Sequence, residues 1–271
     1  MGHRQTDGHR MIIVARRKSQ FGEVKILRCR KNGSHVYCLG DWYQSQADRW
    51  GVSLACYIHA IYGLLRQAEA KKILVLGCAG GTLGTMLVRV GCQVTMVDID
   101  PDAFVLAREF FQLAPEIDCH VGDGRAFLEQ SKARFDAIVV DAFCRNKLPQ
   151  PLCSSEFFRI ARRRLKPQGQ ILFNAILAHD IDPIADMLAA GMEEAGLATR
   201  ILDTPGELDR NAIILGGKID DLEKPMLLVP TDTMDEEITA ELEAMVFRER
   251  RAAHPIRDGD ETIPRRVRRR S

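Results

Sequence analysis

The chain has 271 residues and a formal net charge of +1, so its overall charge gives no preference for nucleic acid or membrane surfaces. Hydrophobic residues make up 46% and charged residues 28%, which is typical of a soluble globular protein with a substantial core. No apolar run reaches the roughly 18 residues of a membrane helix, and the polar residues 1–10 resemble no secretory signal. We therefore expect a cytoplasmic protein without membrane association, in which residues 1–10 are a disordered extension.

The eight cysteines form no CxxC pair and lack metal-site spacing, so we expect reduced thiols and no bound metal. They are Cys29, Cys38, Cys56, Cys78, Cys92, Cys119, Cys144 and Cys153. Arg145 and Lys147 could lower the pKa of the Cys144 thiol, but a plain loop cysteine is the favoured interpretation.

Residues 11–45 predict a small N-terminal β-hairpin module. Strand-like runs alternate with turns here, and Asn32-Gly33 between two such runs is a strong hairpin signal. An aromatic- and Leu-rich helix is expected to follow and to end at Arg66. Tyr57 on this helix most simply packs in the core, although a lid over a nucleoside would use the same residue. Gln44 and Tyr57 are therefore weak candidates for substrate contact.

Residues 72–100 form the stretch around which the chain is organised. A buried strand leads into a turn that contains Gly77, Gly80 and Gly81, and a helix and a second strand ending at Asp98 follow. Glycines let the backbone approach a ligand closely, and the helix start offers free N–H groups. An acid about 20 residues beyond the turn can accept both ribose hydroxyls. The pattern therefore predicts the nucleoside-binding half of a doubly wound fold.

The same turn does not match the dinucleotide fingerprint. That fingerprint requires glycine at the first, third and sixth positions of the turn, where this chain has Gly77, Ala79 and Thr82. The mismatch argues against a hydride-transfer enzyme. A plain α/β domain with a glycine-bearing first turn is the alternative interpretation.

The region 46–230 predicts an α/β fold: a doubly wound, mainly parallel, seven-stranded sheet with helices on both faces. After the organising stretch, helices are expected at 101–111, 125–131, 154–165 and 181–196, and strands at 117–121, 135–140, 170–174, 198–202 and 212–215. Asp98, Asp123 and Asp141 each follow a strand of this series. Because ligands bind at the carboxyl ends of parallel strands, these three acids are expected to share one site.

The C-terminal part has a different character. Residues 231–252 are expected to contain a polar helix, from Asp235 to Arg250, with one apolar face. Residues 253–271 are expected to be a basic, disordered tail. Five arginines among the last seven residues could contact an anionic surface or RNA, but a solvated tail is the favoured interpretation.

Several motifs of this sequence resemble the spermidine synthases, or polyamine aminopropyltransferases, within the Rossmann-like methyltransferase fold. The motifs are ILVLGCAGGTLG, VTMVDIDP, VGDGRAFL, FDAIVVDAF and the Leu-Lys-Pro-x-Gly turn, and the likeness covers roughly residues 20–215. The resemblance implies a transferase of polyamine biosynthesis that uses decarboxylated S-adenosylmethionine as co-substrate and a putrescine-like amine as acceptor. It also implies a homodimer.

The resemblance assigns roles to individual residues. Asp98 matches the acid that holds the ribose hydroxyls, and Asp123 with Gly124 matches the pair beside the adenine. Asp141 matches the acid that acts as base on the attacking amine, and Pro149 lies near a family proline of the adenine pocket.

Three groups that hold amines in the family are missing. Ala79 and Gly80 stand where its glycine loop carries an Asp, and Cys144 replaces its second acid. Its helix His has no counterpart, with Cys56 near that place and His59 one turn away. An acid in the loop would repel the carboxylate of ordinary S-adenosylmethionine, so its loss makes a methyltransferase a competing hypothesis. A nucleoside-binding protein without turnover is the third.

Overall fold

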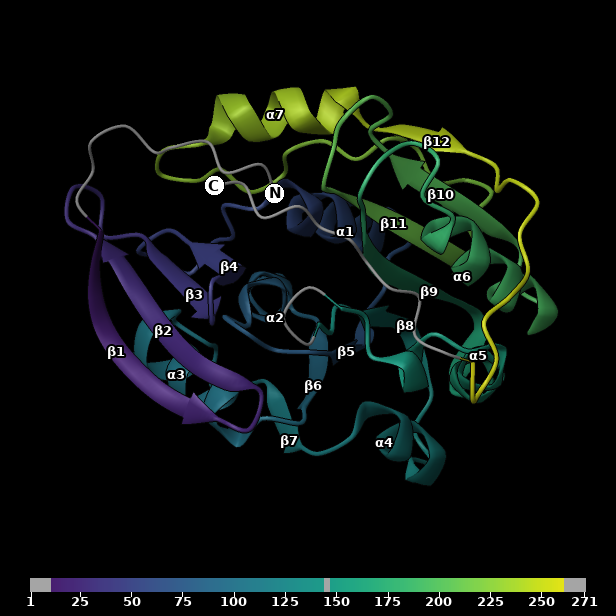
Figure 1. The fold of residues 1–271 in the computed structure, drawn as a ribbon, viewed down its shortest axis with the longest axis horizontal. Coiled ribbons are helices and arrows are strands. Elements are labelled where there is room, and N and C mark those ends of the chain that lie inside the picture. The colour runs from purple at the N-terminus through teal and green to yellow at the C-terminus, as the bar shows by residue number, and fades with distance from the viewer. Residues whose placement is uncertain (1–10, 144–146, 261–271) are drawn as a thin grey trace.

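The computed structural model describes residues 11–143 and 147–260, which form two sheets with helices packed around the larger one (Figure 1). The smaller sheet is an antiparallel meander of β1 (Met11–Ser19), β2 (Gly22–Cys29), β3 (His35–Leu39) and β4 (Trp42–Ala47). Gly33 has φ of 72° in the turn between β2 and β3, which confirms the hairpin predicted at Asn32-Gly33. The N-terminal module therefore consists of four strands.

The larger sheet confirms the predicted doubly wound α/β fold. Its strands are β5 (Lys72–Leu76), β6 (Gln93–Asp98), β7 (Asp118–Val121), β8 (Phe135–Val140), β9 (Leu165–Leu177), β10 (Thr199–Asp203), β11 (Arg210–Gly217) and β12 (Val246–Arg248). Their order is β12-β10-β11-β9-β8-β5-β6-β7, with parallel pairing from β9 to β7 and antiparallel pairing at the other end. The strand order reverses between β5 and β8, which makes that junction the topological switch point.

Helices cover both faces of this sheet. One apolar core joins the sheet to α1 (Cys56–Gln67), α2 (Thr82–Val88) and α7 (Asp235–Ala244). The other core joins it to α4 (Gly124–Gln130), α5 (Ser155–Arg163) and α6 (Ile184–Glu194). Helix α3 (Pro101–Phe110) also packs against the N-terminal sheet, where Leu106 and Phe111 are fully buried. Figure 1 shows α7 lying along α1.

The C-terminal part differs from the expectation. The helix predicted to reach Arg250 ends at Ala244, and the next residues form β12, which extends the expected seven strands to eight by pairing with β10. Beyond β12 the chain runs back to α5 (Figure 1), where Ile256 is 7% exposed and its carbonyl accepts from Ser155 N at 2.9 Å. Residues 253–260, expected to be part of a disordered tail, are thus packed because one apolar residue and several arginine–carboxylate pairs anchor them.

Among the described residues, no helix is both long and apolar enough to span a membrane. The division of the chain into domains, the cytoplasmic location and the arginine tail stay predictions.

Candidate functional site

A pocket lies at the switch point, between the carboxyl ends of the central strands and the N-terminal sheet. Most of the predicted site residues line it: Gly77, Asp98, Asp123, Gly124, Asp141, Pro149 and Gln44. The N-terminal sheet contributes Phe21, Tyr37 and Leu39 to one wall. The three acids that follow consecutive strands therefore face one cavity, as expected for parallel strands whose carboxyl ends meet at one edge.

Asp98, at the end of β6, is tied to the glycine turn of β5. Its Oδ2 accepts from Cys78 N at 2.7 Å, and its Oδ1 accepts from Asp100 N at 2.8 Å. Burial raises the pKa of Asp98, and these backbone hydrogen bonds partly offset that effect. A carboxylate oxygen can accept more than one hydrogen bond, so Asp98 can brace the turn and still accept from the hydroxyls of a ribose.

The turn glycines fall into two groups. Gly77 lines the pocket with φ of 104°, and a side chain here would collide with the carbonyl of Asp141. Gly80 and Gly81 are absent from the pocket wall. An added Cβ at Gly80 would lie 2.7 Å from Ser45 Oγ, and one at Gly81 would collide with Leu113. These two predicted site residues therefore have a packing role that lets the turn fit against its neighbours.

The opposite wall surrounds the start of α4. Asp123 caps this helix, since its Oδ1 accepts from Ala126 N at 2.8 Å, and its side chain is otherwise exposed to the pocket. Pro149 lies on the same wall just before the short helix η1 (Gln150–Leu152). The C-terminal segment supports this wall from behind, because both oxygens of Asp258 accept from Arg125 at 2.7 Å.

Asp141 lines the pocket and comes directly after β8. Its Oδ1 accepts from Asn174 Nδ2 at 2.7 Å, and its Oδ2 accepts from the Tyr57 hydroxyl at 3.3 Å. Burial raises the pKa of Asp141, whereas the hydrogen bonds from Asn174 and Tyr57 lower it. Burial and the neighbouring carboxylate raise the pKa of Tyr57, so its hydroxyl stays a donor. The arrangement presents a half-buried carboxylate to the pocket.

The two groups near the position of the missing family His have other functions. His59 is buried, with Nε2 at 2.7 Å from the carbonyl of Ser53, and burial lowers its pKa, so it acts as a neutral packing residue. Burial raises the pKa of the Cys56 thiol, and the charge of Glu241 adds to the rise. The seven described cysteines are free. Cys144 lies outside the described residues.

Sequence reasoning missed two asparagines behind Asp141. Asn174 interrupts an apolar run in β9. Asn211, in β11, donates from Nδ2 to Asn174 Oδ1 at 2.9 Å. A polar residue between Phe173 and Ala175, just past the point where the pairing of β9 with β8 ends, was the available signal for Asn174. Asn211 carries no such signal because only the antiparallel pairing of β11 with β9 brings it close.

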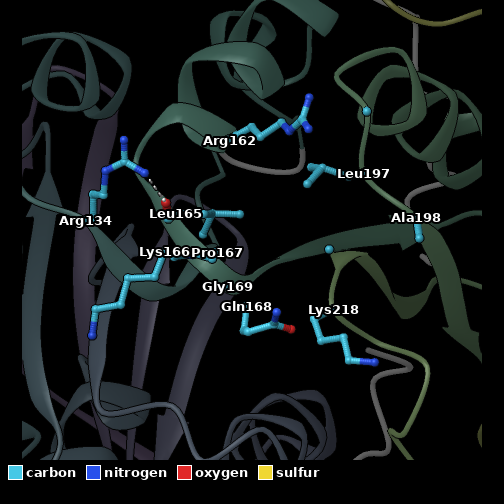
Figure 2. Close-up of a pocket in the computed structure, with 12 residues that line it drawn as sticks. Arg134, Arg162, Leu165, Lys166, Pro167, Gln168, Gly169, Leu197, Ala198 and Lys218 are labelled. Carbon is cyan, nitrogen blue, oxygen red and sulfur yellow. Dashed lines mark hydrogen bonds between the residues drawn. The ribbon is translucent and has the colours of Figure 1, made fainter.

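Figure 2 shows a second hollow, at the amino ends of β8 and β9, away from this pocket. Four cations line it: Arg134, Arg162, Lys166 and Lys218. Arg134 donates to the carbonyl of Leu165 at 3.4 Å, and Lys166 pairs with Asp136 at 2.8 Å. None of the sequence candidates lies in it.

The strand order, the glycine turn braced by an acid and the switch-point pocket define the Rossmann-like fold of S-adenosylmethionine-type transferases. Residues 58–179 match the family model described as Spermine/spermidine synthase domain. The resemblance seen in the motifs is thereby confirmed.

Known proteins of two kinds are similar to this chain. It is 34% identical over 114 residues to the "Probable polyamine aminopropyl transferase" of Bifidobacterium longum, which covers 41% of this chain and 26% of that protein. It is 26% identical over 204 residues to the "N-terminal histidine N-methyltransferase" of Emericella nidulans, which covers 64% of this chain and 37% of that protein. The chain thus spans less than half the length of either relative.

A solved structure agrees over most of the chain. The probable spermidine synthase of Corynebacterium glutamicum superposes with a TM-score of 0.75 at 21% identity, covering 94% of this chain and 99% of that one. At this identity the agreement establishes the fold, which includes the N-terminal sheet.

Proposed function

We propose that this protein is a transferase that binds decarboxylated S-adenosylmethionine and moves its aminopropyl group to an amine, as polyamine biosynthesis requires. One observation carries the proposal. Asp98, Asp123 and Asp141, which the motifs assign to ribose, adenine and base, line a single pocket, in which hydrogen bonds from Asn174 and Tyr57 hold Asp141. The names of the curated aminopropyltransferase relatives support the same reaction.

The chemistry asks little of the protein beyond alignment and a base. An alkylamine with a pKa near the lysine value of about 10.4 is protonated at neutral pH. A carboxylate such as Asp141 attracts this cation and can accept its proton, which leaves a neutral nitrogen. The nitrogen lone pair then forms a bond to the carbon beside the sulfonium, and the carbon–sulfur bond breaks with its electron pair passing to sulfur. Methylthioadenosine and the alkylated amine are the products.

Methyl transfer from ordinary S-adenosylmethionine is the second candidate, and the glycine turn favours it. Ala79 lines the pocket where an acid would repel the carboxylate of that donor, and the turn offers uncharged backbone instead. The relative named as an N-methyltransferase supports this alternative. The same Asp141 would then receive the proton of a methylated amine.

Calorimetric titration with decarboxylated and ordinary S-adenosylmethionine, followed by product analysis with diamines, separates the candidates. We expect tighter binding of the decarboxylated donor and an aminopropylated product that disappears in Asp141→Asn. Preference for the carboxylated donor with methylated product would replace the proposal by the second candidate. Binding without any turnover would favour a nucleoside-binding protein. The homodimer and the putrescine-like acceptor rest on the resemblance alone.

A further inference from the structure

Two asparagines outside the pocket wall form a chain of hydrogen bonds that ends on Asp141. Asn174 is 1% exposed in the central strand β9, between the fully buried Phe173 and Ala175. A buried amide is costly unless it is hydrogen-bonded. Here Nδ2 donates to Asp141 Oδ1 at 2.7 Å, and Oδ1 accepts from Asn211 Nδ2 at 2.9 Å.

The direction of these hydrogen bonds depends on the charge of Asp141. An ionised carboxylate only accepts, so Asn174 must turn its NH₂ group toward it. A protonated Asp141 could instead donate to the Asn174 oxygen, but only after the amide flips. Asn211 opposes that flip, because it donates to the same oxygen and would then face an NH₂ group. The chain therefore favours the ionised form of Asp141, against the burial that favours the neutral one.

We propose that Asn174 is a positioning residue that keeps Asp141 ionised and aimed into the pocket, and that Asn211 fixes the orientation of the Asn174 amide. The inference rests on the proposed function, since a base must be deprotonated to accept the proton of the amine. Tyr57 holds the second oxygen of Asp141 at 3.3 Å, so the carboxylate is restrained from both sides. What remains open to an incoming ammonium is the part of the carboxylate that faces the pocket.

The test compares Asn174→Asp, Asn174→Leu and Asn211→Leu with the parent protein. Asn174→Asp keeps the side-chain size but replaces the donor with a second carboxyl group, and Asn174→Leu removes polarity. We expect both variants to move the acidic limb of the kcat pH profile upward by about one to two pH units. The reason is that the loss of a hydrogen bond to a charged group raises the pKa of that group by about this amount. At a fixed pH below the acidic limb of the parent, kcat should fall roughly 10- to 100-fold with a small change in KM. Asn211→Leu should move the limb in the same direction by less.

Thr199→Val is the matched control. Thr199 is 9% exposed and its hydroxyl donates to Glu193 Oε1 at 2.8 Å, so the variant also loses a part-buried side-chain hydrogen bond, in strand β10, which lies two strands from β9. A merely structural role for Asn174 predicts equal effects in both, without a displaced pH limb. An unmoved limb in Asn174→Leu would overturn the inference.

A second readout does not need turnover. The carboxyl carbons of labelled aspartates report their pKa values by NMR in the full-length protein, and Asp141→Asn assigns the Asp141 signal. We expect Asp141 to titrate at higher pH in Asn174→Leu than in the parent, and in Thr199→Val at the parental pH. A parent protein without turnover would refute the proposed function, whereas an unchanged Asp141 titration would refute the role of Asn174.

Discussion

One buried ion pair holds together the loops that follow β9 and β10, and removing it should destabilise the fold. Asp203, at the end of β10, is 2% exposed, and Arg210, at the start of β11, is 5% exposed. Arg210 donates to both oxygens of Asp203, at 2.7 and 3.1 Å, and also pairs with Asp180 at 3.0 Å. Arg248 donates to Asp203 at 3.2 Å. The pair therefore joins β12 to the loops that follow β9 and β10.

Asp203→Asn keeps the volume and removes the charge. Loss of one partner from a buried pair costs about 3 to 5 kcal/mol, because the remaining charges stay desolvated. In a domain of this size, each kcal/mol of lost stability lowers the melting temperature by about 2 to 4 °C. The melting temperature of Asp203→Asn should therefore be lower by roughly 6 to 20 °C. Urea unfolding and thermal melts measure both quantities. Arg16→Ala, which breaks the exposed pair with Glu23, is the control and should change little.

The pH dependence supplies an independent check. Burial alone would raise the pKa of Asp203, but its hydrogen bonds and charge interactions with Arg210 and Arg248 hold that pKa below its ordinary value. A lowered folded-state pKa stabilises the protein above the unfolded value, and this contribution is lost as the pH falls through the folded one. The difference between the parent and Asp203→Asn should therefore shrink under acidic conditions. A loss below about 1 kcal/mol at neutral pH would refute the reasoning.

Three further predictions concern the pocket at the switch point. Asp98→Asn should weaken methylthioadenosine binding about 10- to 100-fold by calorimetry, since hydrogen bonds to a charged group are lost. In the parent protein, methylthioadenosine binding should decline as the pH falls through the raised pKa of Asp98. Gly77→Ala should destabilise the fold by at least 1 kcal/mol in urea, because its φ of 104° is strained for alanine; equal stability would contradict this. Asp258→Ala should raise KM for the nucleoside donor more than it lowers kcat, because it releases Arg125 beside the pocket wall that we propose holds the adenine.

Local patterns were sufficient to predict that Asp98, Asp123 and Asp141 line one pocket. Asp98 and Asp141 stand at the ends of apolar strands and Asp123 follows the short strand β7, and parallel pairing brings such strand ends together whatever the intervening helices contain. The hairpin at Asn32-Gly33 was likewise readable because its turn chemistry is local. The roles that we propose for these acids come from their positions in the family motifs and not from the geometry of the pocket.

Contacts between segments far apart in the chain could not be predicted from the sequence. Asn174 and Asn211 meet because β11 returns antiparallel to β9, and the sequence does not specify that register. Residues 246–260 looked like the end of a helix and a charged tail, yet the charges of Arg248, Arg257 and Asp258 are matched by acids or an arginine far away in sequence. Charge patterning in a short window cannot distinguish a solvated tail from a segment whose partners lie elsewhere.

We expect the choice between decarboxylated and ordinary S-adenosylmethionine to depend on an acid in the glycine turn. The space around the turn limits which of its residues could be replaced by an acid. A side chain at Gly80 has no room, since its Cβ would lie 2.7 Å from Ser45 Oγ and 2.8 Å from Phe111 Cδ1. Ala79 lines the pocket, and its φ of 45° is one that aspartate tolerates. Ala79→Asp should therefore add a carboxylate beside the donor without forcing the turn apart.

We expect Ala79→Asp to weaken binding of ordinary S-adenosylmethionine by at least 10-fold relative to the decarboxylated donor, because like charges brought together in a partly desolvated pocket repel. Ala79→Asn, similar in size but neutral, is the control and should leave the ratio of the two affinities unchanged. Side-by-side calorimetry measures the ratio. An equal loss for both donors would mean that the charged end of the donor lies away from Ala79, and the discrimination would then have to come from another wall of the pocket.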